Sequence, residues 1–267
     1  MFESVHAKDY YPGEIMAAFL SRDLKDGELG VIGTFSQIPW LACRLAQATH
    51  APSLWFFCGP SAAMNSKFDK LLWSVGDYRM HVGAESRVSL DTVMDLQGHP
   101  WFIDFGFYGG FQIDKYGNLN MAYIGDQKKP KFRGPGTIGT MATAWLNRVY
   151  IFTLAHSPRL FVDKVPFVSG PGFLDGPGGR EKFGCPPRAR GPRYVVTPIA
   201  VFDFEEETKL MRLKSVHPGH TVEEVKSRMG FAPVIPAKVP ETEPPTVEEL
   251  VFMRDFDRDG ILPQLIQ

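Results

Sequence analysis

The sequence predicts an α/β protein whose open, mostly parallel sheet is covered by helices. Short apolar runs that suit buried strands alternate with segments of helical periodicity, an order typical of parallel βαβ units. The chain has 267 residues, 44% of them hydrophobic, which is enough to build a sizeable core. We therefore expect a single domain that spans residues 1–267.

The N-terminal quarter shows this alternation directly. Residues 14–24 repeat apolar side chains at helical spacing and predict a helix, and the apolar run 29–34 predicts a short buried strand. Residues 37–52 again show helical spacing, up to a proline that stops the helix. The apolar run 53–58 follows as a second strand.

The centre of the chain is expected to continue the pattern. The turn Tyr116–Asn118 joins two predicted strands, because glycine and asparagine tolerate the positive φ that tight hairpins require. The predicted helices are 87–99 and 138–147. The predicted strand segments are 101–114, the two strands within 113–125, then 148–156 and 159–170.

The last third begins with a glycine- and proline-rich segment, 170–192, that must be a loop. A long loop inside a compact domain is usually functional or part of an interface. Residues 200–218 alternate like a β-hairpin, and 220–231 resemble a capped helix. A proline-rich linker, 233–245, leads into a last helix at 246–256.

Composition excludes several classes of function. Twenty-nine basic residues nearly balance thirty acidic ones, so no overall field attracts nucleic acid or an anionic membrane. The three cysteines form neither a disulfide framework nor a zinc pattern, and the seven histidines lack ligand spacing, so we expect no metal. No apolar run is long enough to span a membrane and no signal peptide is visible, which predicts a cytoplasmic protein.

The end of the second predicted strand is a candidate reactive position. In open α/β sheets, ligands bind beyond the carboxyl ends of the strands, and Cys58, Gly59, Pro60 and Ser61 lie there. Cys58 could be a nucleophile, but no neighbouring base is visible, so a small core residue is the favoured interpretation. Ser61 is a weaker candidate still.

A second candidate lies at 131–140, where glycines precede a predicted helix. Glycines let backbone N–H groups approach a ligand, and a helix N-terminus adds partial positive charge, so an oxyanion or phosphate cradle is plausible beside a plain turn. Arg133 favours the cradle, because a guanidinium there can hold a carboxylate or polarise a carbonyl.

Two other motifs favour structural interpretations. The segment 170–180 resembles a phosphate loop, but no Lys-Ser/Thr pair follows it. Residues 255–260 begin like a calcium loop, yet Ile266 stands where a bidentate glutamate is needed.

Several segments together resemble the β subunits of class I CoA-transferases, especially the glutaconate type. They are THAP, FQIDKYGNLNMAYIGD, KPKFRGPG, VSGPGFLDGPGGREKFG, AVFDFEEETKLMRL and HPGHTVEEV, and they run along nearly the whole chain. The resemblance implies the open α/β fold and an active site at the interface with a separate α subunit, in a heterodimer or a dimer of heterodimers. It also implies an acyl-CoA substrate, with coenzyme A as part of that substrate and no other bound cofactor.

The resemblance assigns residues as well. Gly134, Gly136 and Thr137 fall on the cradle that gives backbone donors to the thioester oxygen, although the usual Gly-Gly is missing. Asn118 and Asn120 fall in the substrate pocket. Counted from Ala51-Pro52, the position of the family's nucleophilic glutamate is Gly59, which cannot form an acyl anhydride.

The hydrolase of this fold that opens the last ring of steroid nuclei as CoA thioesters is similar in two details. It has glycine at the nucleophile position and Arg-Gly at the cradle, as at Gly59 and Arg133-Gly134 here, and its catalytic carboxylate lies in the α subunit. Hydrolysis of a C–C bond in a β-oxo or cyclic-dione acyl-CoA, with Arg133 catalytic, is therefore favoured over CoA transfer. A decarboxylase with cysteine near this position, matched one residue early by Cys58, and a purely structural partner of the α subunit stay as alternatives.

Overall fold

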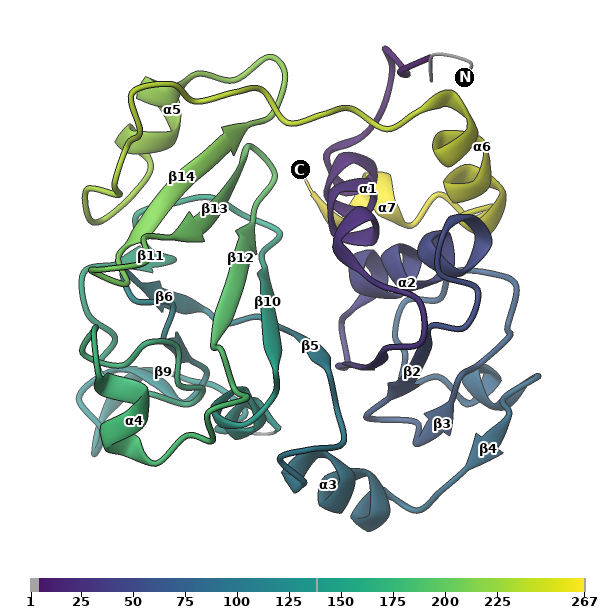
Figure 1. Cartoon of the computed structure of the whole chain (residues 1–267), viewed down its shortest axis with the longest axis horizontal. Coiled ribbons are helices and arrows are strands. Elements are labelled where there is room, and N and C mark those ends of the chain that lie inside the picture. The colour runs from purple at the N-terminus through teal and green to yellow at the C-terminus, as the bar shows by residue number, and fades with distance from the viewer. Residues whose placement is uncertain (1–4, 138, 267) are drawn as a thin grey trace. The chain divides into compact units, whose positions relative to one another are not determined.

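The computed structural model of the chain describes residues 5–137 and 139–266, and it separates into two compact units (Figure 1). Unit 1 comprises Met1–Leu96, Phe102–Phe107 and Thr242–Gln267, and unit 2 comprises Gln97–Trp101 and Tyr108–Glu241. Both combine helices with sheets, so the predicted α/β class is confirmed. The single domain 1–267 stays a prediction.

Unit 1 is built on a βαβ unit. The strands β1 (Leu29–Ile32) and β2 (Trp55–Cys58) pair in parallel through the helix α2 (Gln37–Thr49), and β5 (Phe105–Tyr108) pairs in parallel with β1. Two short strands extend the β2 side in antiparallel fashion, β3 (Ala63–Met64) and β4 (Ser86–Arg87). The predicted strands 29–34 and 53–58 are thus found, each slightly shortened.

Helices surround this sheet and carry most of the core. Helix α1 (Pro12–Asp23) packs on α2, and α6 (Val247–Phe256) packs on both. Trp40 is fully buried, with its ring edge-on to Phe256 at a centroid distance of 5.2 Å. The remaining helical segments of unit 1 are α7 (Leu262–Leu265), the 3₁₀ turn η1 (Tyr78–His81) and, continuing to its end in unit 2, α3 (Leu90–Gly98).

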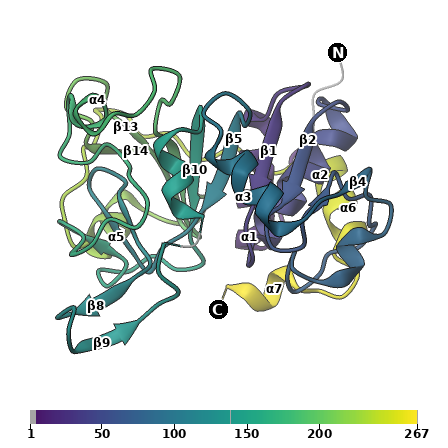
Figure 2. The same ribbon diagram turned by 90° about the horizontal axis from the view of Figure 1, so that it is seen from below.

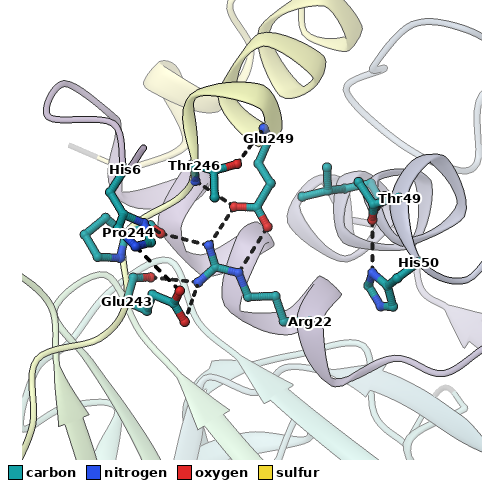
Figure 3. A network of polar contacts seen from close by, with 9 residues as sticks. His6, Arg22, Thr49, His50, Glu243, Pro244, Thr246 and Glu249 are labelled. Carbon is teal, nitrogen blue, oxygen red and sulfur yellow. Dashed lines mark hydrogen bonds and ion pairs between the residues drawn. The ribbon is translucent and has the colours of Figure 1, made fainter. Parts of the chain in front are cut away.

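Arg22 fixes the helix α6 through a bidentate ion pair (Figure 3). Its Nε and Nη2 donate to Glu249 at 3.0 and 2.6 Å, and its guanidinium also donates to the carbonyls of Glu243 and Pro244. Glu249 belongs to a capping box with Thr246, so the pair holds the start of α6 and the end of the proline-rich linker together.

Unit 2 contains more loops. Strands β10 (Arg148–Phe152) and β12 (Pro192–Val196) are parallel, and β13 (Ala200–Phe204) and β14 (Met211–Val216) add an antiparallel hairpin. A smaller sheet contains β11 (Phe161–Val162), β6 (Gln112–Asp114) and β7 (Leu119–Asn120), and β8 (Tyr123–Gly125) forms a hairpin with β9 (Pro130–Arg133). The helical elements are η2 (Thr140–Ala144), α4 (Gly179–Phe183) and α5 (Val222–Ser227).

Four sequence predictions need correction. The helix expected at 138–147 is the 3₁₀ turn η2, which begins after Gly139 in a left-handed conformation; Ile138 lies outside the described residues. The strand segment 101–114 is interrupted between β5 and β6, at the glycine pair 109–110. The strand expected at 159–170 is reduced to β11, and the expected loop 170–192 contains the short helix α4.

Within the described residues, no helix is long and apolar enough to cross a membrane, and no group of three or more His, Cys, Asp or Glu side chains could hold a metal ion.

Two histidines of unit 2 are buried, and one of them contacts helix α5. His156 contacts the Thr197 hydroxyl and donates to the Val225 carbonyl at 3.2 Å, and His217 donates to the Thr197 carbonyl at 2.9 Å. Burial lowers the pKa of each to about 4, and the nearby Arg228 adds to the effect on His156. Both rings are therefore neutral in the folded protein at neutral pH.

These histidines should make folding stability depend on pH. An unfolded histidine titrates near 6.5, so the unfolded state binds more protons as pH falls from 6.5 towards 4, and stability falls by up to about 3 kcal/mol per ring. Urea unfolding of the purified protein between pH 7.5 and 4.5 measures this loss. His156→Gln should flatten the dependence by roughly half; identical slopes for both proteins would contradict the assignment.

Candidate functional site

The turn after β2 has no carboxylate, and its Ser61 hydroxyl is buried without a hydrogen-bonded base among the described residues. Burial raises the pKa of the Cys58 thiol well above its usual range, an effect that the Ser61 side chain only partly offsets. A buried thiol that stays protonated is a poor nucleophile, so Cys58 behaves as a core residue. Gly59 follows, with its N–H bonded to the Ile32 carbonyl at 3.0 Å.

The backbone is strained at Ala62, where this turn ends, and at Asn65, which follows β3. Ala62 and Asn65 have φ angles of 55° and 47°, in the left-handed region that non-glycine residues rarely adopt. The Asn65 side chain donates to Glu85 Oε1 at 2.7 Å and accepts from Gln47 Nε2 at 2.9 Å. Glu85, the first glutamate after the turn, also pairs with Lys67 at 3.2 Å, so this carboxylate already has two partners within the chain.

The glycine-rich segment after β9 is shaped by a close approach of two backbones. A Cβ on Gly134 would lie 2.3 Å from the Met121 carbonyl oxygen, and Gly136 has a φ of +93°. The Gly134 N–H donates to the Ala122 carbonyl at 2.8 Å and the Gly136 N–H to the Met121 carbonyl at 3.1 Å. Both N–H groups therefore already donate to carbonyls of this chain.

Thr137 is the member of the predicted cradle that keeps donors available. It is exposed, and among the described residues neither its N–H nor its hydroxyl forms a hydrogen bond. Its carbonyl accepts from the Thr140 N–H at 2.7 Å, which holds the segment against η2. Thr137 is thus fixed on one side and open to a ligand on the other.

Asn120 supports the glycine-rich segment through the hydrogen bonds of its side chain. It is fully buried, its Nδ2 donates to Gln112 Oε1 and to the Tyr123 carbonyl at 2.8 Å each, and its Oδ1 accepts from the Ala122 N–H at 3.0 Å. Ser169 Oγ accepts from the Met121 N–H at 2.8 Å. Together they fix the Met121–Ala122 backbone whose carbonyls hold Gly134 and Gly136.

Asn118 supports the long loop in the same way. Its Oδ1 accepts from the Gly172 and Leu174 N–H groups at 2.8 and 3.0 Å, and its Nδ2 donates to Asp114 Oδ2 and the Leu174 carbonyl. All of its hydrogen-bonding capacity is used inside unit 2. The placement of Asn118 and Asn120 in a substrate pocket stays a prediction, while their role in shaping the loops is visible.

Arg180 has a structural role in the segment 170–180, whose sequence resembles a phosphate loop. Its buried guanidinium donates to five backbone carbonyls, those of Thr143, Ala144, Pro171, Gly172 and Ala189. The structural interpretation of this loop is therefore supported. Sequence reasoning did not single out Arg180 or Ser169, and in a single sequence nothing separates them from ordinary loop residues.

Arg133 ends β9 and is exposed. Its Nη2 donates to the Gln127 carbonyl at 3.2 Å across the hairpin, and it forms no ion pair with any described carboxylate. Arg133, Gly134, Gly136, Thr137 and the two asparagines all lie in unit 2, and Asn120 is connected to Gly134 through the Ala122 backbone. Cys58, Gly59 and Ser61 form the separate turn of unit 1.

The coenzyme A transferase family matches residues 14–228. The chain belongs to this family. It is 32% identical to one subunit of the 3-oxoadipate CoA-transferase of Pseudomonas knackmussii, over 93% of this chain and 94% of that one. The solved glutaconate coenzyme A-transferase of Acidaminococcus fermentans superposes with a TM-score of 0.84 at 29% identity, covering 96% of this chain and 98% of that one.

A third relative is named for a different activity. The IpdB subunit of the cholesterol ring-cleaving hydrolase of Rhodococcus jostii is 30% identical over 55% of this chain and 56% of that one. The resemblance to CoA-transferase β subunits is thus confirmed, and the family contains both transferase and hydrolase subunits.

Replacing Asn120 by alanine should loosen the cradle. The change leaves the Ala122 N–H and the Tyr123 carbonyl without their partners, so we expect a loss of about 1–3 kcal/mol in unfolding free energy. Hydrogen exchange should become faster at Ala122, Gly134 and Gly136. The control is Asn147→Ala, because Asn147 Oδ1 has no partner among the described residues; equal effects of both variants would refute the supporting role.

Proposed function

We propose that this chain is the β subunit of a cytoplasmic, two-subunit enzyme that hydrolyses a C–C bond in a β-oxo or cyclic-dione acyl-CoA. The α subunit supplies the base, and coenzyme A is part of the substrate, with no further cofactor. The observation that carries the proposal is the turn after β2, where no carboxylate is available and the Cys58 thiol is buried and protonated.

CoA transfer in this family, as the resemblance implies, proceeds through a glutamyl anhydride. From Gly59 to Ser66 the chain contains no acidic residue, and Glu85 is bonded to Asn65 and Lys67. A hydrolytic route removes the need for a carboxylate here, because water becomes the nucleophile.

In this route the partner's base takes a proton from water, and the resulting hydroxide adds to the β-carbonyl carbon. The bond between the α and β carbons then breaks, its electron pair passes into a thioester enolate, and a proton returns to the α carbon. We assign stabilisation of the enolate oxygen to the Thr137 N–H and the Arg133 guanidinium, because both residues are exposed. The products are a carboxylate and a CoA thioester, in one molecule when the substrate is a ring.

The relatives support the substrate class. One is named for 3-oxoadipate, which is a β-oxo acid, and another is named for the cleavage of a ring. The two transferase relatives are each named as one subunit of their enzyme, and the solved hydrolase carries the joint name IpdAB, which supports a heteromeric assembly with an α subunit.

CoA transfer is the second candidate, favoured by the two transferase relatives that match over more than nine tenths of the chain. Decarboxylation is less favoured, because it would rest on the Cys58 thiol. A purely structural role is disfavoured by the exposed Arg133 beside the open donors of Thr137.

A trapping experiment distinguishes hydrolysis from transfer. We expect that incubation of the reconstituted pair with a β-oxo acyl-CoA, followed by borohydride or hydroxylamine, leaves no modification on this chain, since no nucleophile is available. Mass spectrometry should find ¹⁸O from labelled water in the new carboxylate. A trapped thioester on a carboxylate of this chain would establish the transferase function instead.

Arg133→Lys should lower kcat by about 10- to 1000-fold with a smaller change in KM, because lysine keeps the charge but loses the planar donor pair. Steady-state kinetics of the pair measures both constants. Arg159→Lys is the control, as another exposed arginine of unit 2. Near-normal turnover in Arg133→Met would remove Arg133 from the mechanism.

A further inference from the structure

The β8–β9 hairpin concentrates positive charge in a nearly neutral protein. The whole chain has a net charge of −1, yet Lys128, Lys129, Lys131 and Arg133 follow one another on this hairpin, and all four are exposed. Figure 2 shows β8 and β9 extending away from the rest of unit 2. The hairpin therefore carries a local field that the overall composition conceals.

These charges are not neutralised within the chain. Some lysines elsewhere pair with carboxylates, as Lys67 does with Glu85 and Lys115 with Asp163, but none of the four hairpin cations pairs with a described carboxylate. The nearest acid, Asp126, uses Oδ1 to accept from the Lys128 and Lys129 N–H groups at 2.8 and 3.1 Å. It fixes the turn that presents the lysines.

The hairpin has one basic face and one apolar face. Side chains alternate along a strand, so Lys131 and Arg133 share a face, while Phe132 points the other way and packs edge-on against Phe111 at 5.2 Å. The aromatic contact fixes the rotation of β9 about its own axis. Lys131 and Arg133 are consequently presented on the side of β9 opposite Phe132.

The basic face is continuous with the cradle. Strand β9 runs from the lysine-bearing turn directly into Gly134–Thr137, and its four residues span about 13 Å. A thioester oxygen at Thr137 would leave the rest of an extended coenzyme A to run back along β9. The phosphates of the nucleotide end would then reach the lysines, which bind phosphate well as point charges.

We propose that Lys128, Lys129 and Lys131 form the subsite that binds the phosphate groups of the acyl-CoA substrate. This inference rests on the proposed function for its acyl-CoA and its cradle. The hairpin acts on binding and on the rate of encounter, and the chemistry stays at Arg133 and Thr137.

The test uses the reconstituted α/β pair with Lys128→Gln, Lys129→Gln and Lys131→Gln combined. We expect KM for acyl-CoA to rise roughly 10-fold or more, kcat to stay within about 2-fold, and the salt dependence of KM to weaken. The matching acyl-pantetheine, which lacks the nucleotide phosphates, should react equally well with both proteins. The control combines Lys182→Gln, Lys226→Gln and Lys238→Gln, which are exposed lysines of the same unit.

A separate binding measurement keeps the subsite and the reaction distinguishable. Calorimetric titration of the pair with free coenzyme A should show a weaker Kd in the triple variant even if no acyl-CoA tested is hydrolysed, in which case only the proposed function fails. An unchanged KM and Kd would overturn the subsite. An equal loss with acyl-pantetheine, or loss of the α subunit on gel filtration, would also overturn it and indicate a role in folding or assembly.

Discussion

The structure of unit 2 depends on hydrogen bonds to buried backbone groups that lie outside its helices and sheets. Its strands are short, and the segments 114–122 and 169–174 run through the interior, where an unbonded N–H or carbonyl would cost free energy. Asn118 and Asn120 meet this need, because an amide side chain offers a donor and an acceptor in fixed geometry. The cradle's shape follows from Asn120 and Ser169, and the shape of the long loop follows from Asn118.

The two glycine-rich segments look alike in sequence and differ in what their arginines do. Arg180 is buried and gives its donors to five carbonyls, so its guanidinium is used for packing within the chain. Arg133 is exposed and uses one contact, to Gln127. Glycine content only permits close backbone approach. Whether the approach serves packing or binding depends on the burial of the neighbouring cation, which only the fold determines.

The sequence was sufficient for the framework of the fold, while the location of the candidate site stays a prediction. Apolar periodicity found β1, α2 and β2, since each buries one continuous surface, and the motifs predicted the cradle. The periodicity wrongly predicted a long helix at η2, where Gly139 in a left-handed conformation starts a tight turn instead. It also could not show that the Gly136 N–H is bonded to Met121, because that contact joins segments with no shared pattern.

The proposed division of chemistry between subunits follows from what this chain can and cannot supply. It offers neutral and cationic donors at Arg133 and Thr137, and its candidate nucleophile position holds a glycine beside a buried thiol. Donors stabilise an anion as it forms but do not remove a proton, so they lower the barrier only when a base acts on the same substrate. A chain with these residues contributes charge stabilisation and substrate orientation, and proton transfer then requires a carboxylate or another base from the α subunit.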